Sequence, residues 1–180
     1  MPPTRLNIPA HAHDLTFSCF KRKPLLRSKM AKQLLADSIN TAGVKHAFEV
    51  WAYVFMPEHV HLLIYPLHED YSISDILKSI KQSSSRSYVR HLRENNPTAL
   101  RRLETGSTRP RHRLWRKGAG YDRNYWSAEE IRVQVDYIHR NPVRAGLVES
   151  PEDWYWSSAR FWLLGEAGPV IVERENFPMI

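Results

Sequence analysis

The most constraining feature of the sequence is a pair of adjacent β-forming segments, FEVWAYVFM at residues 48–56 and HVHLLIY at residues 59–65. β-Branched and aromatic residues dominate both segments, which is typical of buried strands. Only Pro57 and Glu58 separate them, and so short a connection joins antiparallel strands. The pattern therefore predicts a β-hairpin.

Patterns on either side of the hairpin predict one further strand and four helices, the last an aromatic helix within PEDWYWSSARFWLLG, which starts at Pro151. Residues 14–20 alternate as a strand, and residues 29–42 carry a helical apolar stripe that Gly43 should end. A second helix is expected at about 74–93. A capping box, Ser127 to Glu130, opens a third that runs to about Arg140.

The order strand, helix, strand, strand, helix predicts an α+β fold: an antiparallel sheet with helices packed on one face and the other face open for a ligand. We expect residues 1–13 to be a flexible leader, residues 14–165 to form one domain and residues 166–180 to be a tail, in which 169–173 is a candidate last strand. Residues 101–123 read as a basic loop.

Composition narrows the class of protein. Cys19 is the only cysteine, so neither an intrachain disulfide nor a cysteine metal cluster is expected, and a cytoplasmic location fits best. No run reaches the roughly 18 apolar residues of a membrane span, and no secretory signal is expected at the N-terminus. With 26 Lys and Arg against 19 Asp and Glu, the net charge is +7, which favours a polyanionic partner such as nucleic acid.

Two histidines stand one residue apart in the second hairpin strand. Residues i and i+2 of a strand project from the same face, so His59 and His61 are placed to bind one metal ion. The same spacing at His11 and His13 lies in the expected leader, and we assign that pair no role. Spacing alone leaves a structural reading of His59 and His61 open.

The helix EEIRVQVDYIHRNP carries a tyrosine away from its apolar stripe. Ile131, Val135 and Ile138 mark the buried side, whereas Tyr137 lies off it, with Asn141 one turn further on. A phenol beside a metal site could attack a phosphodiester and form a covalent phosphotyrosine. The alternative is a surface tyrosine followed by a capping asparagine.

Basic residues that could contact phosphates gather in two segments. On the second helix they are Lys78, Lys81, Arg86 and Arg90, and in the following loop Arg111, Arg113, Arg116 and Lys117. Trp115 and Tyr121, among them, could stack on unpaired bases. The alternatives are a solvated helix face and aromatics that pin the loop to the core.

Three segments together resemble a known family. MPEHVHLLIYP is similar to the His-hydrophobic-His (HUH) motif of single-strand DNA nucleases and transposases. YDRNYWSAEEIRVQVDYIHRNPVRAGLVESPEDWYWSSAR resembles the C-terminal signature of REP-associated tyrosine transposases, and HAHDLTFSCFKRKPLL resembles their first strand. The resemblance covers roughly residues 11–165.

This resemblance implies a ferredoxin-like, RRM-like sheet and a transposase that acts as an endonuclease and strand transferase. It implies that His59, His61 and Asn141 bind Mg²⁺ or Mn²⁺ and that Tyr137 is the nucleophile, with Gln134 as a reserve ligand. The implied substrate is single-stranded DNA with imperfect hairpins, bound by a monomer or homodimer. Glycines at 118 and 120 depart from the family pattern, which leaves the DNA sequence open.

Two other functions compete with this one. The open sheet could bind nucleic acid by stacking, without catalysis. Alternatively, a metal-activated water could hydrolyse the substrate, with Tyr137 only orienting it.

Overall fold

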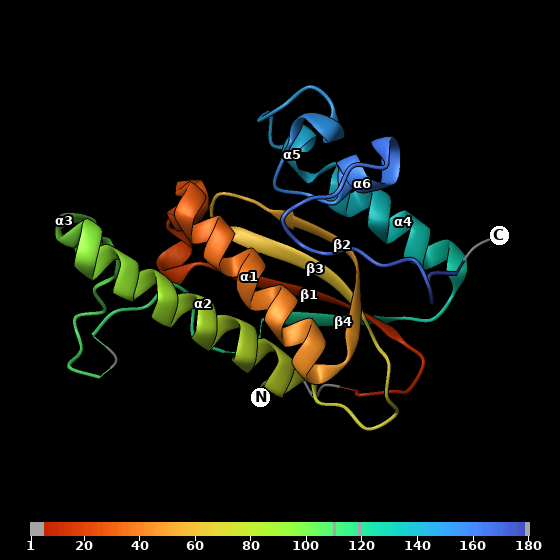
Figure 1. Cartoon of the computed structure of the whole chain (residues 1–180), viewed down its shortest axis with the longest axis horizontal. Coiled ribbons are helices and arrows are strands. Elements are labelled where there is room, and N and C mark those ends of the chain that lie inside the picture. Colours follow the sequence, from red (N-terminus) through yellow and green to blue (C-terminus); the bar gives the residue numbers. More distant parts are fainter. Residues whose placement is uncertain (1–5, 110, 119, 179–180) are drawn as a thin grey trace.

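A computed structural model describes residues 6–109, 111–118 and 120–178 (Figure 1). Four antiparallel strands form one sheet in the order β2-β3-β1-β4. The strands are β1 (Ala12–Ser18), β2 (Phe48–Phe55), β3 (His59–Pro66) and β4 (Tyr121–Tyr125). The helices are α1 (Lys29–His46), α2 (Ile73–Asn95), α3 (Pro97–Leu100), α4 (Ala128–His139), α5 (Asn141–Arg144) and α6 (Ala159–Leu164). The predicted α+β fold and the β2–β3 hairpin are confirmed.

The two long helices cover one face of the sheet. α1 and α2 lie side by side across it in Figure 1, and their apolar residues pack on the inward side chains of β2, β3 and β1. Leu15, Leu62 and Tyr53, from three adjacent strands, are fully buried in this cluster. None of the helices in the described part of the chain is long and apolar enough to cross a membrane.

The opposite face is only partly open. Ile131, Val135 and Ile138 of α4 pack there on Trp51 and Leu63, so the stripe predicted from the sequence is the buried side of the helix. An amphipathic helix has to bury this stripe, and the second face of the sheet is where it does so. The part of this face that α4 leaves free carries the polar residues described below.

β4 replaces part of the expected basic loop. YDRNY offers little apolar alternation, yet residues 121–125 pair with β1 as an edge strand. Gly120 makes this approach possible: its φ is +75°, and a Cβ there would lie 2.4 Å from the backbone oxygen of Thr16. The sequence prediction was wrong here because pairing, rather than an apolar pattern, defines the strand.

Two element boundaries also differ from the prediction. β1 begins at Ala12, and His13 is fully buried, with its ring nitrogens hydrogen-bonded to Asp122 and Tyr71, so the expected leader is shorter. α1 continues past Gly43 to His46 and ends with Ala47 in the left-handed conformation. A Cβ at Gly43 would lie 3.4 Å from the Phe48 carbonyl oxygen, an ordinary van der Waals contact, so the packing of α1 on the start of β2 does not require a glycine there.

The C-terminal segment lies along the β2 edge without forming the candidate strand at 169–173. The Glu173 N–H donates to the Val50 carbonyl, and Phe177 packs against Trp51 and Trp162. The segment therefore covers one side of the apolar cluster between α4 and the sheet.

Candidate functional site

The two histidines of β3 share one face of the sheet, with ring centroids 5.2 Å apart. Each engages its Nδ1 atom locally: His59 with Glu58 Oε1 at 2.9 Å, and His61 with Thr16 Oγ1 at 3.0 Å. No hydrogen bond among the described residues uses either Nε2. Burial, the largest cause, lowers the pKa of His59, which favours the neutral imidazole that metals bind.

Tyr137 contacts one member of this pair, His61. Its ring meets the His61 ring edge-on, with centroids 5.9 Å apart, and 39% of the residue is exposed. The Arg144 guanidinium lies over the same phenol ring at 4.1 Å. The phenol and the imidazoles, distant in sequence, thus converge within one chain.

The local sequence of α4 explains the position of the tyrosine. Ser127 accepts a hydrogen bond from the Glu130 N–H, as the predicted N-cap requires, and its hydroxyl donates to the Glu130 carboxylate. The reciprocal bond of a capping box, from the Ser127 backbone N–H to that carboxylate, is not among the described hydrogen bonds. With the apolar stripe buried on the sheet, Tyr137 projects to the side, over the end of β3 where His61 lies. The sequence pattern of the helix therefore directs the phenol toward the histidines.

The two amide candidates for the third ligand have different surroundings. Gln134 is fully engaged: its Nε2 donates to Asp14 Oδ2 and its Oε1 accepts from the Tyr125 hydroxyl, both at 2.9 Å. Asn141 is buried and donates through Nδ2 to the carbonyls of Tyr137 and Ile138. The described hydrogen bonds leave its side-chain oxygen free, so Asn141 is the better candidate.

These donors fit a divalent cation that accepts nitrogen and oxygen. No group of three His, Cys, Asp or Glu side chains in the described ranges could hold a metal ion. A third protein donor beside His59 and His61 would accordingly be of another type, such as an amide. Two neutral imidazoles and an amide oxygen suit Mn²⁺, and Mg²⁺ where waters complete the shell.

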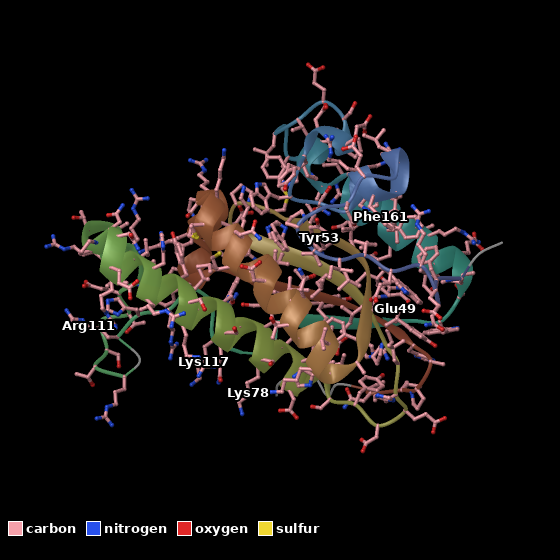
Figure 2. The ribbon with its side chains drawn as sticks, viewed as in Figure 1. Glu49, Tyr53, Lys78, Arg111, Lys117 and Phe161 are labelled. Carbon is pink, nitrogen blue, oxygen red and sulfur yellow. The ribbon has the colours of Figure 1, made fainter. Side chains whose placement is uncertain are left out.

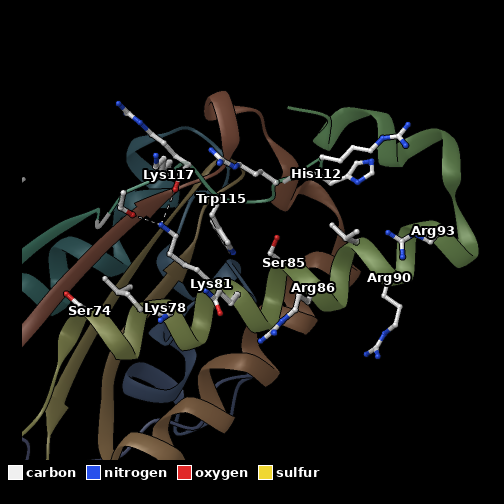
Figure 3. Close-up of a pocket in the computed structure, with 17 residues that line it drawn as sticks. Ser74, Lys78, Lys81, Ser85, Arg86, Arg90, Arg93, His112, Trp115 and Lys117 are labelled. Atoms are coloured by element: carbon white, nitrogen blue, oxygen red, sulfur yellow. Dashed lines mark hydrogen bonds between the residues drawn. The ribbon is translucent and has the colours of Figure 1, made fainter. Parts of the chain in front are cut away.

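A cationic groove of about 920 Å³ lies between α2 and residues 111–118 (Figure 3). Nine Lys and Arg residues line it and no Asp or Glu does: Lys78, Lys81, Arg86, Arg90, Arg93, Arg111, Arg113, Arg116 and Lys117. Figure 2 shows Lys78, Arg111 and Lys117 along α2, well separated from Glu49 and Phe161. The structure thus unites the two predicted basic segments.

Three of the predicted DNA contacts, Trp115, Lys81 and Tyr121, have surroundings that differ from those of the other predicted contacts. Trp115 is only 5% exposed, its ring packs on Phe17 and its N–H donates to Ser84, so it pins the loop to the core. Lys81 donates to the carbonyls of Arg116 and Gly118 and thereby holds the loop on α2. Tyr121 lies outside the groove, 56% exposed at the start of β4.

Sequence reasoning missed three polar residues beside the histidines and the tyrosine. Thr16 and Asp14 reach His61 only through the pairing of β1 with β3, and a single sequence does not reveal that register. Arg144 lies on α5, beyond the end of α4 at His139, so its position over the Tyr137 ring depends on the junction of the two helices and helical spacing does not predict it.

Comparisons with known proteins agree with this geometry. The family model described as "Transposase IS200 like" matches residues 8–141. The chain belongs to this transposase family. A protein of Haemophilus influenzae assigned as a REP-associated tyrosine transposase is 26% identical over 118 residues, which cover 63% of this chain and 60% of that relative.

A solved structure gives the same fold. It is the REP-associated tyrosine transposase bound to a REP hairpin, with a TM-score of 0.70 and 21% identity, covering 100% of this chain and 98% of that one. The resemblance inferred from the histidine and tyrosine motifs is confirmed at the level of family and fold.

Proposed function

We propose that this protein is a metal-dependent endonuclease and strand transferase that forms a covalent 5′-phosphotyrosine with single-stranded DNA beside a hairpin. The observation that carries the proposal is the contact between Tyr137 and the histidine pair within one chain. A solvent-accessible phenol against two imidazoles with free Nε2 atoms has the parts of a phosphoryl-transfer site.

The proposed reaction exchanges one phosphoester bond for another. The Tyr137 oxygen loses its proton to water and attacks phosphorus, the P–O3′ bond breaks, and the 3′-oxygen leaves as a hydroxyl after taking up a proton. The 5′-phosphate remains on Tyr137, and attack by a 3′-hydroxyl reverses the step without ATP. Arg144, stacked on the phenol, supplies positive charge where the phenolate and the phosphate meet.

His59, His61 and the Asn141 oxygen would hold Mg²⁺ or Mn²⁺. When bound, such an ion neutralises the phosphate and stabilises the charge that develops on it. The chain's own residues prepare for this: Glu58 and Thr16 occupy the Nδ1 atoms, which leaves Nε2 on both rings for a ligand.

Two surfaces with different chemistry support a hairpin substrate. The groove offers cations without an exposed aromatic residue in its lining, which suits the paired backbone of a stem. Exposed aromatics, Tyr121 and Trp126, lie instead at the two ends of β4, where unpaired bases could stack. The structural neighbour is itself bound to a REP hairpin.

The decisive experiment is an adduct assay. The protein is mixed with Mn²⁺ and an end-labelled single strand that carries an imperfect hairpin, and the products are separated under denaturing conditions. We expect a protein–DNA species that Tyr137→Phe and EDTA both abolish. Asp136→Asn, an exposed neighbour on the same helix, is the matched control and should retain the adduct.

Two results would contradict the proposal. Free cleaved DNA without an adduct, still formed by Tyr137→Phe, would indicate a water nucleophile. Hairpin binding without cleavage under any divalent metal would indicate a binding module.

A further inference from the structure

Asp14 is a buried carboxylate with one oxygen unsatisfied. It lies in the middle of β1 and is 4% exposed. Oδ2 accepts from Gln134 Nε2, but Oδ1 is buried and has no hydrogen-bond partner in the described part of the chain. A buried acceptor without a partner lowers stability, and its presence in a native structure points to a function.

The unsatisfied oxygen faces the candidate metal site. Asp14 Oδ1 lies 3.7 Å from His61 Nδ1, just beyond hydrogen-bond length, and Thr16 Oγ1 shares that nitrogen at 3.0 Å. Because Nδ1 and Nε2 lie on opposite edges of the ring, Asp14 is not placed to bind an ion held at Nε2. Its position is that of a carboxylate behind a ligand histidine.

A directional chain of hydrogen bonds fixes this carboxylate. Burial, and after it the Asp14 charge, raises the pKa of Tyr125 to about 12, so its hydroxyl stays protonated and donates to Gln134 Oε1. The amide orientation that follows makes Gln134 Nε2 the donor to Asp14. The chain connects β4, α4 and β1 and ends at an acceptor that faces His61 on β3.

We propose that Asp14 is a positioning residue for His61, an inference that rests on the proposed metal-dependent function. Its carboxylate, 3.7 Å from His61 Nδ1, favours the tautomer with the proton on Nδ1, where Thr16 Oγ1 lies at 3.0 Å, and so leaves Nε2 for the cation. Cation binding at Nε2 strengthens Nδ1–H as a donor, which gives Oδ1 its missing partner. Through Gln134, the same carboxylate couples the orientation of His61 to the helix that carries Tyr137.

Asp14→Asn tests this with little change in shape. The asparagine oxygen can still accept from Gln134, which turns its amide N–H₂ toward His61 Nδ1 and favours the Nε2–H tautomer. We expect Mn²⁺ affinity, measured by electron paramagnetic resonance without DNA, to fall about 10- to 100-fold. Asp136→Asn is the control and should bind Mn²⁺ like the wild type.

A second measurement needs no metal. Nitrogen-15 NMR of the wild-type imidazoles at neutral pH should show His61 protonated at Nδ1, and Asp14→Asn should move that proton to Nε2. A wild-type His61 protonated at Nε2 would overturn the proposal, as would wild-type Mn²⁺ affinity in folded Asp14→Asn. If the wild type bound no Mn²⁺, the proposed function would fail, while the NMR result would still decide the role of Asp14.

Discussion

The cationic groove and the catalytic face are assembled in different ways. Groove residues are near neighbours on one helix and one loop, as Arg86 and Arg90 one turn apart on α2 illustrate. The residues of the proposed catalytic site and their supports come from β1, β3 and α4, and meet only through strand pairing and helix packing. Long flexible cations tolerate displacement along a phosphate backbone, whereas a nucleophile and its metal ligands must meet within a few ångströms.

The largest expected effect separates chemistry from binding. His61→Ala removes an imidazole from the catalytic face, and losing metal assistance worth several kcal/mol should slow adduct formation by about 10³-fold or more. Hairpin affinity in EDTA, measured by fluorescence anisotropy, should stay within about twofold, since the groove is unchanged. An equal loss of binding and cleavage would contradict the separation of the two surfaces.

The converse change acts on the groove. Arg86→Ala with Arg90→Ala should weaken hairpin binding by about 10- to 100-fold and reduce the slope of log affinity against log salt by about 0.9 for each phosphate that the protein no longer neutralises. Single-turnover cleavage at saturating DNA should be unchanged. The corresponding control, Lys45→Ala on α1, lies outside the groove and should preserve the salt slope.

A smaller effect should distinguish the residues that contact unpaired DNA from those that contact the paired stem. Tyr121→Ala removes an exposed ring from β4, and stacking on one base is worth about 1–3 kcal/mol. We expect this loss for a hairpin with single-stranded flanks and none for a blunt hairpin, in parallel anisotropy titrations. Equal losses on both DNAs would place Tyr121 with the groove.

The smallest expected effect concerns the contact between the end of β1 and the loop of residues 111–118 that lines the groove. There Cys19, just after β1, forms an isolated β-bridge with Trp115. Burial raises the pKa of the Cys19 thiol to about 12, so at pH 8 it should react with a disulfide reagent only as fast as the protein opens. The pKa of the Cys19 thiol is higher in the folded protein than in the unfolded chain. Between about pH 9 and 12 the thiol therefore ionises only in the unfolded chain, and the free energy of unfolding should decline as pH rises through this range. Rapid reaction of Cys19 with the reagent in the absence of denaturant would show that this contact is open in the folded protein and would contradict the prediction.

The same contrast explains what the sequence could predict. The β2–β3 hairpin, the capped α4 and the histidine–tyrosine pairing followed from periodicity, turn length and motif. The basic segments followed from composition, but the burial of Trp115 and the tethering of Lys81 depend on tertiary contacts. Asp14 carries no motif, and its place behind His61 exists only once β1 has found its register.

The register of β1 also fixes a distance across the sheet. Thr16 is paired with His61 on one side and with Tyr121 on the other, so the start of β4 and the histidine strand are two strand spacings apart, about 10 Å. The groove loop leads directly into that start through Gly120. If the groove holds a stem and Tyr137 cuts the strand, as proposed, this strand spacing sets the number of nucleotides between the foot of the stem and the scissile phosphate, independently of the DNA sequence.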